Sequence, residues 1–144
     1  MGGCASCSAE AKRQAEYGGL SGITFDAGGL IALDRDDRRV LALLARNSEL
    51  GMRVTIPATV LAQAMRNPAR QARLSRLIRQ PNTDLVALDG PDATATGLIL
   101  AASRTSDITD AHVVMCARRA VQVIITSDAD DLRRIDPNLQ IVAV

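Results

Sequence analysis

The sequence predicts one α/β domain, in which a parallel sheet is covered by helices on both faces. Three observations support this fold class. From residue 23 onward, short β-branched runs alternate with longer helical patterns, which is typical of βαβ units. At 144 residues, the chain has room for one domain that buries about two thirds of its unfolded surface. No internal repeat or low-complexity tract interrupts this part of the chain.

Short apolar runs separated by helical patterns give the predicted elements. The predicted strands are residues 22–25, 53–56, 85–88, 123–126 and 141–144. The predicted helices are residues 36–50, 58–66, 69–79 and 91–103, a helix from residue 109 or 110 to 120, and a last short helix that ends at residue 135. Their ends carry helix signals, since Gly51 stops the first helix, Pro57 opens the second and Pro91 opens the fourth.

The composition restricts the classes of function. Seventeen basic residues nearly balance 16 acidic ones, so a nucleic-acid partner would need a local basic patch. Tyr17 and Phe25 are the only aromatic residues, which excludes single-stranded RNA binding on an aromatic stacking platform. No apolar stretch approaches the roughly 20 residues of a membrane span, and no secretory signal is present, so we expect a cytoplasmic protein without membrane contact.

The N-terminal segment shows no pattern that would join a core. We interpret residues 1–22 as a disordered extension or an added segment, so that the domain spans residues 23–144. Cys4 and Cys7 form a CxxC pair, but a zinc site would need two more ligands. Cys116 lies within an apolar helical stretch and is interpreted as a buried small hydrophobe.

Four aspartates stand where apolar runs end or helices begin: Asp26, Asp107, Asp110 and Asp128. Asp26 closes the first predicted strand, Asp128 closes the fourth, and the other two open the helix before the fourth strand. If these two strands are parallel neighbours, all four side chains converge at one edge of the sheet. Taken singly, each aspartate also has an ordinary interpretation as a helix cap or a turn residue.

Together, the four aspartates predict a metal centre. Two carboxylates about 4 Å apart repel by roughly 4 kcal/mol at an effective dielectric near 20, so such a cluster is unfavourable without a cation. Oxygen ligands without histidine or thiolate select Mg²⁺ or Mn²⁺ rather than zinc, and such a site suits phosphodiester hydrolysis. Asp131 is a possible outer ligand. Thr126 and Ser127 are candidates to bond a water, a phosphate oxygen or the local backbone.

His112 and the arginines are further candidates. The only histidine, His112, is expected to point away from the helix face that presents Asp107 and Asp110, which argues against a general base. A series of arginines interleaved with leucine and isoleucine is either a solvated helix face or a stripe that binds phosphate or an acidic partner. These residues are Arg66, Arg70, Arg73, Arg76 and Arg79. The arginine pairs at positions 38–39, 118–119 and 133–134 are candidates to flank the aspartates.

Three sequence blocks resemble the PIN domain family, and especially the VapC-type toxins of bacterial toxin–antitoxin operons. The blocks are FDAGGLIAL at 25–33, DITDAHVVMCARR at 107–119 and TSDADDL at 126–132. The resemblance implies a Rossmann-like, three-layer α/β/α sandwich with a metal-dependent ribonuclease site at the C-terminal strand edge. By position, Asp26, Asp110 and Asp128 match the family's metal-binding aspartates, and Asp107 lies one turn before Asp110 in the same acidic pocket.

One position departs from the family pattern. Gln63 stands where the family usually carries a glutamate; an amide keeps an oxygen acceptor but loses the charge, which predicts weaker metal affinity or turnover. The resemblance also implies a homodimer, and a cognate antitoxin whose tail covers the acidic site. The expected substrate is RNA, and the expected cofactor is Mg²⁺ or Mn²⁺.

Three other classes were compared with this interpretation. In a receiver-type signalling domain Asp89 would be the phosphoacceptor, but that site needs a lysine after the fifth strand, and Lys12 is the only lysine. A haloacid-dehalogenase-like phosphatase needs a second acid at position 28, where this chain has Gly28. A catalytically weak PIN-like module that binds RNA or an antitoxin without cleavage stays open because of Gln63.

Overall fold

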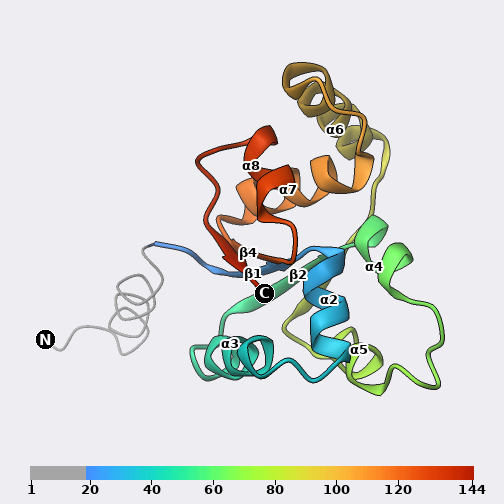
Figure 1. The fold of residues 1–144 in the computed structure, drawn as a ribbon, viewed down its shortest axis with the longest axis vertical. Helices are drawn as coiled ribbons and strands as arrows, with labels where there is room; N and C mark the ends of the chain where they lie inside the picture. The colour runs from blue at the N-terminus through green and yellow to red at the C-terminus, as the bar shows by residue number, and fades with distance from the viewer. Residues whose placement is uncertain (1–18) are drawn as a thin grey trace, which may run out of the picture.

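The computed structural model describes residues 19–144 and shows a parallel sheet between two layers of helices (Figure 1). The strands are β1 (Gly22–Phe25), β2 (Arg53–Pro57), β3 (Thr83–Val86), β4 (Val123–Thr126) and β5 (Ile141–Ala143). The predicted fold class is confirmed. Cys4, Cys7 and most of the predicted N-terminal extension lie outside the described residues; within it, Leu20 packs against the core and Ser21 N donates to Val121 O at 2.8 Å.

Helices cover both faces of the sheet. Within residues 19–144 they are α2 (Ala27–Asp34), α3 (Arg38–Glu49), α4 (Ala58–Ala64), α5 (Ala72–Leu77), α6 (Gly90–Ser103), α7 (Ile108–Ala120) and α8 (Ala129–Ile135). Helices α6, α7 and α8 lie on one side, and α2, α3 and α5 lie on the other (Figure 1). None of the helices in this part of the chain is long and apolar enough to cross a membrane.

The strand order brings the ends of β1 and β4 together. All five strands are parallel, in the order β3-β2-β1-β4-β5, and Phe25 of β1 pairs with Ile125 of β4. Asp26 and Asp128, which follow these two strands, therefore emerge at the same edge. The chain order also reverses between β1 and β4, and such a switch point is where parallel α/β sheets usually bind ligands.

Helix α7 crosses the centre of the sheet, packing on β1, β2 and β4. Its residues 111–117 are all buried. His112 is fully buried, its Nδ1 lies 2.8 Å from Thr59 Oγ1 of α4, and burial lowers its pKa, so the ring is a neutral link between two helices. Cys116 is 2% exposed and burial raises its pKa to about 11, which confirms that it is a buried hydrophobe.

The sequence pattern does not predict α2. Its first turn contains Gly28 and Gly29, which are poor helix formers, and its apolar residues do not form a single stripe. A Cβ on Gly28 would lie 2.8 Å from the backbone N of Ser127, and a Cβ on Gly29 would lie 3.1 Å from the carbonyl carbon of Ile125. The glycines therefore allow α2 to pack directly on the end of β4, beside Asp26.

Strand β3 and helix α3 also differ from the predicted bounds. The predicted strand at 85–88 is wrong by two residues, since β3 begins at Thr83. The side chain of Arg53 in β2 forms two hydrogen bonds of 2.6 Å with Asp84, and these hold the polar residues Thr83 and Asp84 in the strand. The predicted helix at 36–50 begins only at Arg38, since Asp37 accepts hydrogen bonds from the backbone N of Arg39 and Val40.

The predicted helices at 58–66 and 69–79 are shorter in the structure, because the chain between α4 and α5 is an ordered loop. The buried amide of Gln71 accepts from the backbone N of Arg66 and of Asn67, each at 2.8 Å, and donates to Ala64 O at 2.9 Å. These bonds satisfy backbone groups at the end of α4 without further helix.

Gly29→Ala is expected to lower the free energy of unfolding by about 1–3 kcal/mol, because the added methyl group would overlap the backbone of Ile125. Gly97→Ala in α6 is the matched control, since a Cβ there meets nothing within 4 Å, and alanine should stabilise the helix by roughly 0.5–1 kcal/mol. Urea unfolding measures both changes. Stabilisation by Gly29→Ala would contradict the close packing of α2 on β4.

Candidate functional site

Asp26 is held at the end of β1 by hydrogen bonds to both of its carboxylate oxygens. Its Oδ1 accepts from Ala27 N and its Oδ2 accepts from Thr126 Oγ1, each at 2.7 Å. The Thr126 hydroxyl oxygen in turn accepts from Asp128 N at 2.9 Å. Asp26 is 7% exposed and Thr126 is fully buried. One threonine therefore links the ends of β1 and β4, and it does so by bonding the local carboxylate and backbone.

The other two aspartates come from the start of α7. Asp107 is the N-cap of this helix, and its Oδ1 accepts from Asp110 N at 2.9 Å. The helix therefore begins at Ile108, one or two residues before the predicted start at 109 or 110. Asp110 lies half-buried in the first turn, and its carboxylate has no hydrogen-bond partner among the described residues. Asp128 precedes α8 without capping it through its side chain.

The acidic side chains are close enough to perturb one another. Burial raises the pKa of Asp26 against the lowering effect of the hydrogen bonds from Thr126 and Ala27. Burial also raises the pKa of Asp110 to about 7, and the negative charges of Asp107, Asp26, Asp131 and Asp128 add to that rise. Asp110 therefore binds a proton at a much higher pH than an ordinary aspartate does.

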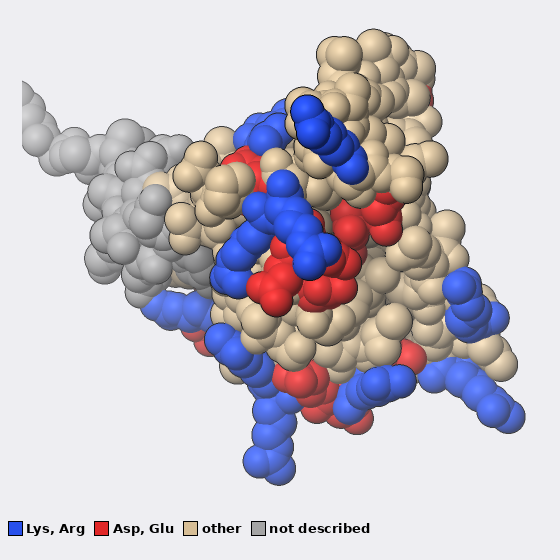
Figure 2. Space-filling model, turned by 45° about the horizontal axis from the view of Figure 1, so that its top comes forward, with Lys and Arg blue, Asp and Glu red and all other residues tan. Residues whose placement is uncertain are grey.

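Asp131 of α8 belongs to the same cluster. Its hydrogen bond with Asp128 and the charge of that carboxylate raise its pKa. Asp107, Asp110 and Asp131 line one pocket of about 420 Å³, which also contains Arg104 and Arg134. We call this the acidic pocket. Figure 2 shows acidic side chains gathered in a hollow with basic side chains beside them.

The acidic pocket has the donor chemistry of a magnesium or manganese site, because its ligand candidates are all oxygens. Within residues 19–144, however, no group of three or more Asp, Glu, His or Cys side chains is arranged to hold a metal ion as it stands. Asp26 already uses both of its oxygens in hydrogen bonds. The metal centre therefore stays a prediction, and the structure describes a carboxylate cluster in which burial and neighbouring charges raise the pKa of Asp110.

Gln63 and Ser127, two other predicted accessory residues, lie near the acidic residues in the structure. Gln63 of α4 donates from Nε2 to Thr109 Oγ1 at 3.1 Å, so its side chain meets the first turn of α7 next to Asp110. Ser127 is exposed in the turn between β4 and α8, where it faces Gly28. His112, the fifth residue of α7, bonds to Thr59 and is fully buried.

The arginines divide between the two layers of helices. Of the predicted flanking pairs, Arg134 lines the acidic pocket, whereas Arg119 pairs with Asp92 at 2.9 Å. Arg104 also lines this pocket, and sequence reasoning missed it. Arg104 stands alone between polar residues, so neither periodicity nor pairing with another arginine marks it in the sequence.

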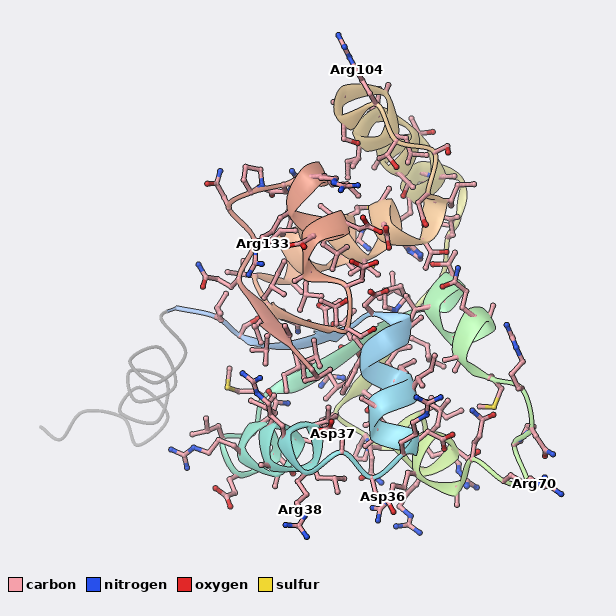
Figure 3. The ribbon with its side chains drawn as sticks, in the orientation of Figure 1. Asp36, Asp37, Arg38, Arg70, Arg104 and Arg133 are labelled. Atoms are coloured by element: carbon pink, nitrogen blue, oxygen red, sulfur yellow. The ribbon has the colours of Figure 1, made fainter. Side chains whose placement is uncertain are left out.

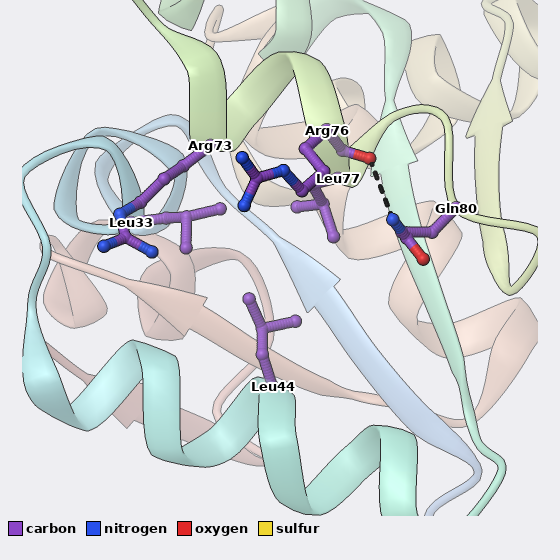
Figure 4. A pocket seen from close by; sticks show the side chains of 6 residues that line it. All are labelled: Leu33, Leu44, Arg73, Arg76, Leu77 and Gln80. Atoms are coloured by element: carbon purple, nitrogen blue, oxygen red, sulfur yellow. Dashed lines mark hydrogen bonds between the residues drawn. The ribbon is translucent and has the colours of Figure 1, made fainter.

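The predicted arginine stripe lies in the layer opposite α7. Arg73 of α5 forms an ion pair with Asp36. Arg73 and Arg76 border a second pocket of about 170 Å³, and its apolar walls come from Leu33, Leu44 and Leu77 (Figure 4). This pocket joins α2, α3 and α5 and is separate from the acidic one.

Comparison with known proteins supports the fold. No family model and no curated protein matches the chain. Among solved structures, it is similar to a chain in the crystal structure of VapBC2 from Rickettsia felis bound to a DNA fragment from its promoter. The TM-score is 0.62 at 13% sequence identity, and the match covers 85% of this chain and 98% of that one. At this identity the similarity shows a shared fold.

Asp110→Asn is expected to stabilise the protein more at pH 8 than at pH 5. The pKa of Asp110 is about 7 in the folded protein against an ordinary 3.8, so the folded state binds more protons between these values and stability falls as pH rises through 7. Asparagine stays neutral and escapes that loss. Thermal unfolding of both proteins from pH 5 to pH 8 measures the difference.

The control for this titration is Asp130→Asn, which removes one negative charge from a side chain that is 89% exposed on the same helix as Asp131. A gap between wild type and Asp110→Asn that does not change with pH would show that Asp110 does not titrate in this range.

Proposed function

We propose that the protein is a PIN-type ribonuclease that uses Mg²⁺ or Mn²⁺ to hydrolyse RNA phosphodiester bonds. The observation that supports this most directly is the convergence of Asp26, Asp107, Asp110 and Asp128 at the switch point of a parallel sheet, where burial and the neighbouring carboxylates raise the pKa of Asp110 to about 7. The family resemblance of the three sequence blocks and the shared fold with a VapBC2 chain support the same class. The proposed site of action is the cytoplasm.

In this proposal Asp26, Asp110 and Asp128 hold the cation, and Asp107 supports it from the N-cap of α7. The cation would supply a water of lowered pKa and would neutralise charge on the phosphate. The protein's own contribution is rigidity, because Thr126 fixes both Asp26 and the backbone of Asp128. Because the pKa of Asp110 is raised to about 7, a cation would displace a proton from this carboxyl group, so we expect metal affinity to rise with pH.

The proposal includes partners. VapBC2 is described as bound to a promoter DNA fragment, and by analogy we propose that this chain is a toxin that pairs with a cognate antitoxin and forms a homodimer. The pocket bordered by Arg73 and Arg76, with its leucine walls, has the charge and polarity to take an acidic, partly apolar segment of such a partner.

The alternative is a PIN-like module that binds RNA or an antitoxin without cleavage. Gln63 favours this alternative, because it places a neutral amide where it meets the first turn of α7. A pure binding module needs no tight cation site, so metal affinity and cleavage distinguish the two.

The first test is cleavage of an end-labelled structured RNA with Mn²⁺, Mg²⁺ or EDTA. We expect metal-dependent cleavage by wild type, and Asp26→Asn or Asp128→Asn to lower kcat/KM at least about 100-fold, because each removes a proposed ligand. Asp130→Asn, the exposed charge-matched control, should cleave like wild type. If several RNAs are not cleaved and calorimetry detects no Mn²⁺ binding, the ribonuclease proposal is wrong and the alternative of a binding module is supported.

A second test restores the missing charge. Gln63→Glu is expected to tighten Mn²⁺ binding by about 10-fold, because it adds a carboxylate beside the first turn of α7. Gln80→Glu serves as the matched control, since that amide bonds to Arg76 O in the opposite helix layer. Equal Mn²⁺ affinity for wild type and Gln63→Glu, measured by calorimetry, would show that position 63 takes no part in the site.

A further inference from the structure

A groove runs from the acidic pocket along the surface between α6, α7 and α8. A third pocket, of about 410 Å³, adjoins the acidic pocket and shares Ser103, Arg104, Arg134 and Ile135 with it. Arg118 of α7 joins the two shared arginines, and the walls include the apolar side chains of Leu98 and Ile99. We call this third pocket the arginine groove. Because it shares a wall with the acidic pocket, a bound chain could occupy both.

The arginines of the groove have charge to offer a ligand. Arg104 extends from the end of α6 into solvent (Figure 3), and it forms no ion pair with another described residue. Arg134 lies 3.4 Å from Asp131 with its side chain 80% exposed, and Arg118 lies 2.8 Å from Asp136 with its side chain 47% exposed. The pair of Arg134 with Asp131 is exposed on both sides, and such pairs are weak, so a phosphate can replace Asp131 at little cost; Asp136, the partner of Arg118, is only 13% exposed.

Hydroxyl groups stand between the arginines and the aspartates. Thr105 and Ser106 line the acidic pocket, and Thr105 Oγ1 accepts from Asp107 N at 3.3 Å, which leaves its own proton free to donate. Arginine and hydroxyl donors are the groups that contact phosphate and sugar in nucleic-acid complexes. The walls of the groove contain no aromatic side chain, so the contacts would be to the backbone and not to stacked bases.

The backbone conformation of Arg104 makes its side chain suitable for a mutational test. This residue ends α6 with φ 56°, a left-handed conformation that glycine adopts most easily, and its N–H bonds to Leu100 O. An arginine here costs stability that a glycine would restore. Val121 has the same conformation at the end of α7, so this conformation does not by itself indicate binding, but it allows Arg104→Gly to remove the side chain without destabilising the fold.

We propose that the arginine groove binds the phosphate backbone of the RNA strand on one side of the cleaved bond, with Arg104 and Arg134 as phosphate contacts. This inference rests on the proposed ribonuclease function. The acidic pocket repels RNA unless a cation is bound, so the adjacent arginines would supply the attraction that brings the strand to the site. The groove would recognise RNA with little preference for sequence.

The test measures binding of a short labelled RNA by fluorescence anisotropy in Mg²⁺ at several salt concentrations, with Asp128→Asn in every protein to prevent cleavage. Arg104→Gly and Arg134→Ala are each expected to weaken binding about 5- to 10-fold and to reduce the slope of log affinity against log salt by about 0.7. Arg104→Gly should also raise Tm, so weaker binding cannot be attributed to unfolding.

Two matched controls separate charge from backbone. Val121→Gly relieves the same left-handed conformation at the end of α7 (φ 54°) without removing a charge, so it should raise Tm and leave RNA affinity unchanged. Arg35→Ala removes an exposed arginine at the end of α2, in the opposite helix layer, and should also leave RNA affinity unchanged.

The outcomes distinguish the groove from the ribonuclease. If both groove variants bind RNA with unchanged affinity and salt slope, the proposal that the arginine groove binds RNA is wrong. RNA cleavage by the protein with native Asp128 would still support the proposed ribonuclease function in that case. A change in oligomeric state without a change in RNA affinity would assign the groove to a protein interface and also overturn the proposal. If RNA is neither bound nor cleaved, both proposals fall.

Discussion

The buried hydrogen bond from Thr126 to Asp26 is the interaction on which the site depends. It joins the ends of β1 and β4, two strands that lie about a hundred residues apart in the chain, and it is 2.7 Å long. A buried carboxylate needs such partners, because an unpaired one would lose its hydration without compensation. Since Thr126 also accepts the backbone N–H of Asp128, one side chain positions two of the four aspartates. The glycines of α2 allow the close approach that this geometry requires.

The charged carboxylates of the acidic pocket destabilise the fold, and helix capping does not explain why Asp110 is placed there. Asp107 alone caps α7, whereas Asp110 caps nothing and lies half-buried, and burial together with the neighbouring carboxylates raises its pKa to about 7. Burial and crowding destabilise the charged forms, and a proton or a cation relieves that destabilisation. These carboxylates are attached to the ends of two strands and to the start of a helix, so they cannot move apart without disturbing the fold. Affinity for a cation is the property that such an arrangement would supply.

The net charge of +1 conceals a strong separation of charge. Carboxylates gather where β1 and β4 end, Arg104 and Arg134 stand beside them, and Arg73 and Arg76 lie in the other layer next to an apolar pocket. This separation provides two surfaces of different chemistry on opposite sides of the sheet. One suits a phosphate chain and a cation, and the other suits an acidic and apolar segment of a protein. An RNA substrate and a protein partner could therefore be bound by different parts of the domain.

The sequence by itself determined the α/β class, four of the five strands to within one residue, and the position of Asp26 and Asp128 directly after apolar runs. These features follow from local patterns together with the rule that parallel strands present their ends at one edge. Only the tertiary structure decided that residues 27–34 form a helix, that β3 begins at Thr83, and that Arg104 stands at the acidic pocket. Each of these depends on contacts between distant residues, such as Gly28 with Ser127 and Arg53 with Asp84. Local sequence carries no signal of such contacts, because the partner that makes them favourable is brought near only by folding.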